Sequence, residues 1–457
     1  MKTHIKNKSL LLAVSVALAS NMTSAKTSKD DFDKLGKELT PMGAVQSANK
    51  DGSIPAWTGG IKKAPEGYNI GDHHVNPYPN DKIKYTITAK NIESYKNLLT
   101  PGQVKLFETY PDTFKMNIYQ THRSASYPEH VYQAVNTNAA RAELVKEGNG
   151  IKGAAVGIPF PVPANGLEAI WNHTLRYRGE RVTRQGGQAA PTASGDYTYV
   201  GLQESLLLPY NVKGASPTEL EETNILFKFK QKVSEPARLA GTALLVHETM
   251  DQIKTPRQAW TYNTGQRRVR RAPNVAYDAP GTASDGLRTT DDFDMYNGAP
   301  NRYNWELKGK KELLIPYNDY QLHSDKVKYS EILLAGHINP ELVRYEKHRV
   351  WVVEATLKEN TRHIYKKRIF YIDEDSWQVA ITDIYDNRDE LYRVGISHTI
   401  NYYEVPTHWS TLDVFHDLQS RRYIALGLDN EAKMYDFSVK LKQKSFTPSA
   451  LRREGRR

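Results

Sequence analysis

The second part of the chain, from about residue 197, is built from short stretches in which hydrophobic and polar residues alternate. In residues 224–233, Ile225, Phe227 and Phe229 fall on one face and lysines on the other, as in a strand with one wet side. Turn residues separate such stretches at the spacing of antiparallel hairpins. No crossover of helical length separates the last four, which excludes a doubly wound parallel sheet there. We expect strands at 224–233, 242–248, 344–357, 366–373, 377–385 and 391–405.

The first part of the chain lacks this alternation. Residues 42–79 are rich in glycine, proline and asparagine, which predicts an ordered but irregular wrap that Trp57 and Ile61 pin to the body. Helices are expected where start signals occur, the clearest being Thr100 as N-cap ahead of Pro101. The expected helices span 30–39, 92–99, 102–109, 138–147 and 165–177, and a helical stretch at 326–334 interrupts the strands.

Two of the expected strands have no fully polar face. In 349–357, Trp351 belongs to an apolar face while valines begin the other, and the strand that starts at Trp377 is similar. A sheet covered by helices on one face and curled around an apolar cavity on the other would have this pattern, and so would a sandwich with both faces buried. The predicted fold class is α+β: a large curved antiparallel sheet with covering helices and an irregular N-terminal wrap.

Residues 257–273, RQAWTYNTGQRRVRRAP, predict a hairpin with an unusual charge distribution. Side chains alternate across a strand, so arginine occupies both faces of the returning arm. A charge-protected sheet edge and a surface that faces anions both explain this distribution. The faces carry Arg267 and Arg271 with Val269 on one side, and Arg268 and Arg270 on the other.

The N-terminal residues have the composition of a secretory signal peptide, with cleavage expected after about Ala25. Lys2 and Lys6 belong to a basic start, and the apolar run at 10–19 is too short to span a membrane. The chain contains no cysteine, which excludes disulfides and a lipid-modified cysteine anchor. We expect a soluble periplasmic protein that contacts the outer membrane peripherally, if at all.

The mature chain is expected to form one structural domain overall. A formal net charge of +10 is modest for the length and is concentrated in the C-terminal tail. The expected organisation is a signal peptide at 1–25, an N-terminal helical and irregular region at 26–196 packed on the sheet, a curved antiparallel sheet core at 197–415, and a C-terminal extension with a basic tail at 416–457.

Catalytic motifs are not found in the sequence. It has no phosphate loop, no dinucleotide-binding glycine motif and no nucleophile elbow. His73 and His74 lie in a flexible, proline-rich stretch without neighbouring ligands at metal spacing. The acids Asp291, Asp292 and Asp294 predict a solvated loop rather than a calcium site. We expect no enzyme activity, no cofactor and no metal site, and export argues against nucleic acid as a partner of the arginines.

Four separated motifs, in this order, resemble the bacterial DUF1329 family. They are LTPMGAVQSANKDGSIPAWTGGI at 39–61, WTYNTGQRRVRRAP at 260–273, YEKHRVWVVEATLKENTRHIYKKRIFYIDEDSW at 345–377 and FTPSALRREGRR at 446–457. That family is classed with the LolA/LolB-like envelope proteins, often labelled outer-membrane lipoprotein-sorting proteins. The resemblance implies a LolA-like half-barrel, lined with apolar residues and lidded by helices, whose cavity holds acyl chains in LolA-like relatives. It also implies an exporter of the resistance-nodulation-division type, or an outer-membrane protein, as a partner.

Two functions are compatible with these features. The first hypothesis is a soluble periplasmic carrier that binds a lipid or other hydrophobic ligand in the half-barrel cavity and exchanges it with a membrane partner of the envelope. The alternative is a non-enzymatic accessory subunit of an exporter or outer-membrane complex, with no cargo cavity. The residues expected to bind ligand or partner are Trp260, Tyr262, Arg267, Arg268, Arg270, Arg271, Trp351 and Trp377.

Overall fold

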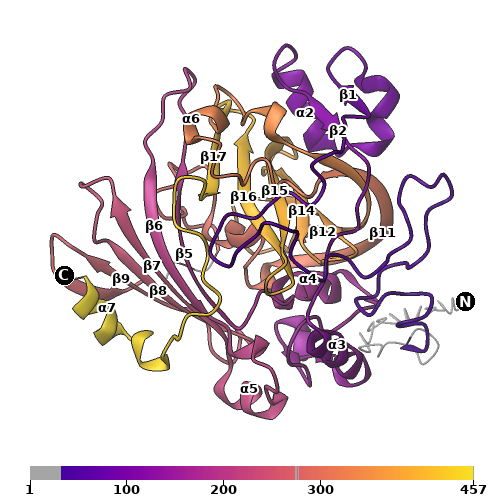
Figure 1. Cartoon of the computed structure of the whole chain (residues 1–457). Coiled ribbons are helices and arrows are strands. Elements are labelled where there is room, and N and C mark those ends of the chain that lie inside the picture. The colour runs from indigo at the N-terminus through magenta and orange to yellow at the C-terminus, as the bar shows by residue number, and fades with distance from the viewer. Residues whose placement is uncertain (1–31, 273–274, 276, 456–457) are drawn as a thin grey trace, which may run out of the picture.

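One large sheet organises the computed structural model, which describes residues 32–272, 275 and 277–455 (Figure 1). The expected strands at 224–233, 242–248 and within 344–405 are all present, as is the hairpin. The strands are β1 (Tyr85–Ile87), β2 (Met116–Ile118), β3 (Glu143–Leu144), β4 (Ile151–Lys152), β5 (Arg181–Ala189), β6 (Val200–Leu207), β7 (Ile225–Glu235), β8 (Ala243–Thr249), β9 (Gln258–Asn263), β10 (Arg268–Arg271), β11 (Tyr303–Pro316), β12 (Tyr345–Leu357), β13 (Lys367–Asp373), β14 (Val379–Tyr385), β15 (Leu391–Tyr402), β16 (Thr407–Asp417) and β17 (Arg422–Leu428).

The sheet is antiparallel and open. Fifteen strands hydrogen-bond in the order β1, β2, β12, β13, β14, β15, β16, β17, β5, β6, β7, β8, β9, β10, and β11 pairs with β12 beside this path. A single parallel contact joins β2 to β12. Within the described residues, the two ends of the path do not pair with each other, so the sheet curves without closing (Figure 1). This confirms the α+β fold class with a large curved, half-barrel-like antiparallel sheet.

Short helices cover the sheet. Thr100 caps α2 (Pro101–Thr109) as expected: its hydroxyl accepts a hydrogen bond from the Gln103 amide, and the Gln103 side chain accepts one from the Thr100 amide. The expected helix at 92–99 is a 3-10 helix, and the helical stretch at 326–334 is a single turn. The helices are η1 (Ile92–Leu98), α2 (Pro101–Thr109), α3 (Glu129–Arg141), η2 (Lys146–Gly148), α4 (Gly166–Leu175), η3 (Pro209–Asn211), α5 (Pro217–Thr223), η4 (Thr290–Met295), η5 (Pro300–Arg302), α6 (Tyr329–Ile332), η6 (Pro340–Leu342), η7 (Gln443–Ser445) and α7 (Pro448–Glu454).

Two helix predictions were wrong. Phe32 is helical, but residues 33–39 form turns with a bridge between Leu35 and Leu39, and the start of the predicted range, like the signal peptide, lies outside the described residues. The helix expected at 138–147 begins instead after Pro128 and ends at Arg141. Ala142 is extended, and the following residues pair as the hairpin β3–β4, which takes the backbone hydrogen bonds that a helix would have used.

Strands β11 to β17 form the packed half of the sheet, in which β14, β15 and β16 are buried on both faces. Val353, Phe370 and Trp409 belong to one core cluster, which also receives α3 and α4. Ile381 and Val414 belong to a second cluster, which receives α2. Both faces of these central strands are therefore covered by other parts of the chain, while the strands remain part of the one curved sheet.

Strands β5 to β10 form the fanned half, which spreads away from the packed half in Figure 1. Its outer face is covered by the C-terminal helix α7, whose Leu451 packs with Leu245 of β8 and Tyr262 of β9. Lys230 of β7 also pairs with Glu454 at 2.7 Å. The sheet thus extends beyond the range 197–415 expected for it, since β5 and the central β17 lie outside that range.

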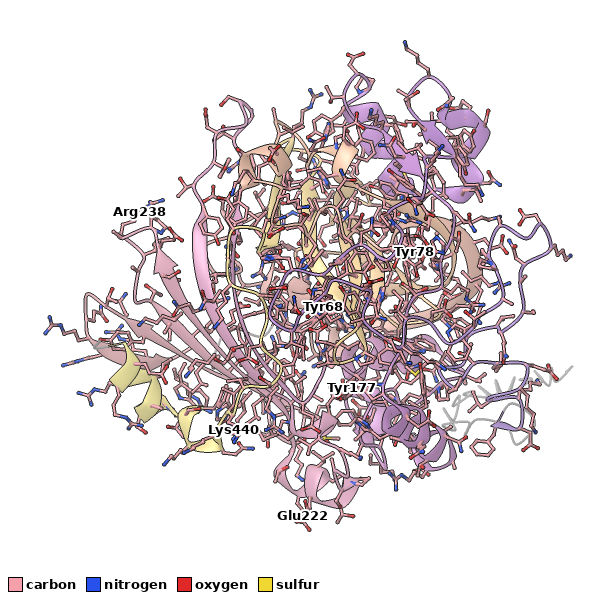
Figure 2. All side chains as sticks on the ribbon, in the orientation of Figure 1. Tyr68, Tyr78, Tyr177, Glu222, Arg238 and Lys440 are labelled. Carbon is pink, nitrogen blue, oxygen red and sulfur yellow. The ribbon has the colours of Figure 1, made fainter. Side chains whose placement is uncertain are left out.

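The irregular wrap predicted for residues 42–79 holds neither helix nor strand. Figure 2 shows Tyr68 and Tyr78 on this wrap in front of the sheet, and the Tyr68 ring meets that of Tyr403 edge-on at 4.9 Å. Ile61 packs against the first core cluster, as expected. In the part of the chain that the structure describes, no helix is long and apolar enough to cross a membrane.

Candidate ligand-binding site

A row of paired residues crosses the inner face of the fanned half. In antiparallel sheets, residues directly opposite each other point to the same face. Strand register therefore places six consecutive partners, one from each strand between β5 and β10, on one face. The row begins with a charged pair beside the packed half and ends at the exposed sheet edge. Its members are Arg184, Glu204, Gln231, Leu244, Thr261 and Arg270.

Residues 275 and 277–297, which we call the roof segment, lie over the inner face of this row. Ion pairs hold the roof to the packed half: Asp291 lies 2.7 Å from Arg368 of β13, and Asp294 lies 2.6 Å from Arg176. Burial opposes ionisation of Asp294, but Arg176 and Arg178 hold the pKa of that carboxyl well below its usual range.

The expectation of a solvated acidic loop was therefore wrong. Asp291, Asp292 and Asp294 are each more than nine-tenths buried. Their partners, Arg368 and Arg176, are distant in sequence, and an alternation pattern does not reveal such pairs. These carboxylates anchor the roof segment because a buried charge needs an opposite charge beside it.

An apolar cavity of about 260 Å³ lies between the roof segment and the strands β7, β8 and β9. This volume exceeds the ~150 Å³ that accommodates a benzene ring and approaches the lower end of the ~300–1,000 Å³ typical of ligand pockets. Arg257 closes one wall, where its guanidinium lies 2.6 Å from Glu248. The apolar part of the lining consists of Phe227, Phe229, Leu244, Val246, Val275, Pro280 and Phe293.

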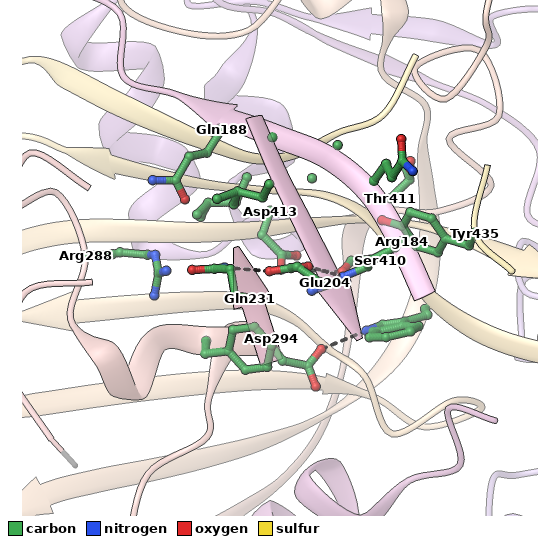
Figure 3. A pocket seen from close by; sticks show the side chains of 18 of the residues that line it. Arg184, Gln188, Glu204, Gln231, Arg288, Asp294, Ser410, Thr411, Asp413 and Tyr435 are labelled. Carbon is green, nitrogen blue, oxygen red and sulfur yellow. Dashed lines mark hydrogen bonds and ion pairs between the residues drawn. The ribbon is translucent and has the colours of Figure 1, made fainter. Parts of the chain in front are cut away.

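A smaller, polar cavity of about 70 Å³ adjoins it, toward the packed half (Figure 3). Glu204 pairs with Arg184 and accepts a hydrogen bond of 2.6 Å from Gln231. Burial, reinforced by the charge of Asp294, raises the pKa of the Asp413 carboxyl to about 6. This end of the site can therefore hold polar groups and protons, whereas the larger cavity can hold hydrocarbon.

Arg288, on the roof segment, lines both cavities together with Gln231 and Phe293. The residue is 8% exposed, and Figure 3 shows its guanidinium directed toward Gln231. Burial lowers the pKa of this guanidinium. The site therefore combines an apolar floor with one buried cation at the boundary to a polar chamber.

The hairpin arginines Arg267, Arg268, Arg270 and Arg271 are all exposed, and the last three lie on the edge strand β10 of the sheet. Arg267 lies in the turn with φ of +50° instead of in the strand, so its predicted place on the face of Val269 was wrong. The turn takes four residues because pairing stops at Asn263.

Strand register settles which hairpin residues face the cavity. Thr261 lines the cavity and pairs with Arg270, so Arg268 and Arg270 point to the cavity face, although neither lines the cavity itself. The opposite face carries Arg271 together with the expected site residues Trp260 and Tyr262, and it packs against α7.

Trp351 and Trp377 lie elsewhere, in the packed half. Their rings stack at 6.1 Å, and nine strands separate β12 from β9 along the sheet. Trp377 is fully buried and donates a hydrogen bond of 2.8 Å to the Met42 carbonyl. The structure thus brings the hairpin residues together and places the tryptophan pair under the N-terminal wrap.

Two other polar clusters lie outside these cavities. His348, Asp373 and Asp375 offer ligand atoms within 4.8 Å of one another. Arg123 already donates to both Asp375 oxygens, at 2.8 and 2.6 Å. Burial, with Asp375 adding, raises the pKa of Asp373 to about 6. The cation that balances this buried cluster is therefore an arginine of the chain.

The second cluster surrounds His74, for which the expectation of a flexible stretch without neighbouring ligands was wrong. His74 is 3% exposed, its Nδ1 lies 3.1 Å from His323, and its Nε2 lies 2.7 Å from Glu404. These neighbours come from far along the chain. The cluster ties the N-terminal wrap to the sheet.

Sequence reasoning missed Arg288 and the roof segment. Arg288 lies in a loop of glycine, alanine and serine without a hydrophobic period, so nothing local marks it as buried. The hydrophobic alternation of residues 224–233 did predict the face that carries Phe227 and Phe229, and that face lines the cavity.

A family model and a relative match this chain over most of its length. The family described as "Protein of unknown function (DUF1329)" matches residues 86–452. An uncharacterized protein of Pseudomonas aeruginosa, PA3922, is 52% identical over 443 residues, which cover 97% of each chain. Among solved structures, an outer membrane lipoprotein-sorting protein domain from Vibrio parahaemolyticus aligns with 14% identity and a TM-score of 0.44, over 63% of this chain and 98% of that domain. A DUF1329 family protein from Desulfovibrio piger aligns with 13% identity and a TM-score of 0.42, over 60% of this chain and 92% of its own.

Proposed function

This chain belongs to the DUF1329 family, and we propose that it is an exported, periplasmic carrier of a hydrophobic ligand. The observation that carries the proposal is the apolar cavity of about 260 Å³ between the roof segment and β7 to β9. A concave, mainly apolar chamber with a few convergent polar groups is the usual form of a small-molecule site.

The strength of binding follows from the burial of hydrocarbon. A tail of about ten methylenes contributes about 8 kcal/mol at about 0.8 kcal/mol each, before the costs of association are subtracted. Binding of that order is exchangeable, as delivery to a membrane partner of the envelope requires. The chain would hold its ligand without chemistry.

The hairpin arginines are proposed as a steering surface for this exchange. Arg268 and Arg270 are exposed on the cavity face, and guanidinium groups match phosphate and carboxylate geometry. An exposed cationic edge would attract anionic headgroups or an acidic partner, such as a subunit of an exporter or an outer-membrane protein. Trp260 and Tyr262 would support that edge from the face covered by α7.

The accessory-subunit hypothesis is favoured by one observation of its own. The packed half of the sheet is filled on both faces by the chain's own side chains. If the fanned half bound no ligand, the whole sheet would act as a scaffold for a partner. The apolar cavity is the feature that separates the two hypotheses.

A cavity-filling substitution tests the carrier proposal. Leu244 lines the cavity and is only partly buried, so Leu244→Trp would occupy the chamber without overpacking a closed core. We expect saturable binding of a fluorescent fatty acid to the native protein and binding at least tenfold weaker in the variant.

The matched control is Ile253→Trp, which adds the same indole at a residue that is 57% exposed. It should bind the probe as the native protein does. Absence of saturable binding to the native protein, or equal binding by Leu244→Trp, would contradict the carrier proposal.

A further inference from the structure

Arg288 is a buried cation without a carboxylate beside it. The residue is 8% exposed, and no acidic oxygen of the described residues lies within 4.0 Å of its guanidinium. One of its nitrogens, Nη1, donates to the Thr289 carbonyl at 3.2 Å, whereas Nε has no hydrogen-bond partner within the described chain. A buried charge normally has an opposite charge in contact, because desolvation alone costs several kcal/mol.

The acids nearest to Arg288 are engaged elsewhere. Glu204 is held by Arg184 and Gln231, and Asp413 accepts a hydrogen bond of 2.8 Å from Ser397. Asp292 accepts hydrogen bonds from the Thr289 amide and hydroxyl and from the Tyr365 hydroxyl, and it also faces Arg368. These carboxylates act on Arg288 from a distance, and none of them forms an ion pair with its guanidinium group.

The position of the guanidinium is constrained by the roof segment. A Cβ atom at Gly281 would lie 2.7 Å from the central guanidinium carbon, so the glycine lets the arginine lie flat against the backbone. Arg288 also lines both the apolar and the polar cavity. A group bound to its free nitrogens can therefore continue directly into the hydrocarbon-lined chamber over Phe229 and Val246.

We propose that Arg288 binds the anionic group of a single-chain amphiphile, a carboxylate or a phosphate monoester, while the tail lies in the apolar cavity. This inference rests on the proposed carrier function and names the chemical class of its ligand. The guanidinium fork matches both oxyanions bidentately. The cavity volume of about 260 Å³ suits one chain of medium length better than two long chains.

Ligands that share one tail and differ only in the headgroup test the proposal. Decanoate, decyl phosphate and decanol share one tail, and each can displace a neutral fluorescent probe from the full chain. We expect the native protein to bind at least one anion tenfold more tightly than decanol, and the favoured anion identifies the headgroup.

Substitution of Arg288 should abolish the preference for the anionic headgroup and leave the binding of the tail unchanged. In Arg288→Gln, all three ligands should bind within about twofold of one another, with the affinity for decanol unchanged. Arg288→Lys should restore part of the preference. The control is Arg238→Gln, at an exposed tip on the rim of the fanned half, which should keep the native preference (Figure 2).

The outcomes separate this inference from the carrier proposal. If decanol binds the native protein as tightly as the anions do, or if Arg288→Gln keeps the preference, the role of Arg288 is wrong and the carrier stands. If none of the ligands binds, both are wrong.

Thermal unfolding supplies a second readout. Because Arg288→Gln removes an uncompensated buried charge, it should unfold at the native temperature or above. A variant that fails to fold would contradict the proposal, since the guanidinium would then be a structural partner of Glu204, Asp292 and Asp413.

Discussion

The two halves of the sheet bury their residues differently. In the packed half, strands such as β14 and β16 are buried on both faces, and buried acids there meet arginines or hydroxyls directly. In the fanned half, β7 alternates buried and half-buried residues and β10 is exposed except at Val269. One sheet therefore contains a rigid scaffold beside a surface that retains a chamber.

From this difference we expect the packed half to determine the stability of the protein and the fanned half to determine ligand binding. Close-packed interiors leave few voids. The cavity of about 260 Å³ lies in the fanned half, against β7, β8 and β9. The roof segment spans both regions, anchored by Asp291 and Asp294 on the packed side and carrying Arg288 over the fanned side. Substitutions in the packed half should change folding, and substitutions in the fanned half should change ligand binding.

The largest effect is expected where the roof is anchored. Arg368→Leu would leave Asp291 buried without its guanidinium, and breaking a buried pair in this way costs about 3–5 kcal/mol. Urea denaturation should show that loss in the free energy of unfolding. A loss below about 1 kcal/mol would mean that the roof is held by other contacts.

A pair of truncations compares the halves directly. Ile381 is fully buried in the packed half, so Ile381→Ala should cost about 2–5 kcal/mol. Leu244 borders a cavity and is only partly buried, so Leu244→Ala should cost about half as much or less. Equal losses of unfolding free energy in urea denaturation would contradict the proposed difference between the two halves.

The packed half should also make stability depend on pH. Burial raises the pKa of Asp383 to about 7, although Thr100, Gly102 and Tyr371 donate hydrogen bonds to it. Since the folded pKa lies above the unfolded value, the stabilisation from this group is complete below about pH 4 and is lost as the pH rises to about 7.

The matching variant is Asp383→Asn, which cannot ionise. Between pH 4 and 7 it should lose less stability than the native protein, by up to about 1.4 kcal/mol per pH unit. Parallel stability curves for the two proteins would show that Asp383 does not titrate in this range.

The smallest effects are expected at the exposed hairpin. Arg268→Gln with Arg270→Gln removes charge from the cavity face, whereas Arg267→Gln with Arg271→Gln removes it elsewhere. Only the first pair should slow association with an anionic ligand, by a few-fold and only at low salt, because exposed charges are screened. Equal and negligible effects in stopped-flow measurements would leave the arginines as protection of a sheet edge.

Much of the fold could be predicted because alternation is local. The six expected strands and the hairpin are present, and the resemblance to the DUF1329 family is confirmed by the match over residues 86–452. The strands β11 and β16 escaped prediction because lysines, histidines and acids interrupt their apolar pattern. In β16, Asp417 is nevertheless buried, because Arg393 of the neighbouring strand β15 pairs with it at 3.1 Å.

The site was less accessible to sequence reasoning. The hairpin stands out in the sequence through its charge, and in the structure its Thr261 lines the chamber. Arg288, by contrast, carries a single charge in a loop, and it lines the cavity together with Phe229 and Val246, which lie more than 40 positions away in the sequence. A cation enclosed by long-range packing leaves no local periodic signal.

Native mass spectrometry of the protein purified from its own cell envelope tests the central claim most directly. We predict that the native chain carries a bound single-chain amphiphile, that Ile253→Trp carries it too, and that Leu244→Trp carries none. A native chain with no adduct, or an adduct of equal abundance in Leu244→Trp, would contradict a ligand-binding chamber in the fanned half.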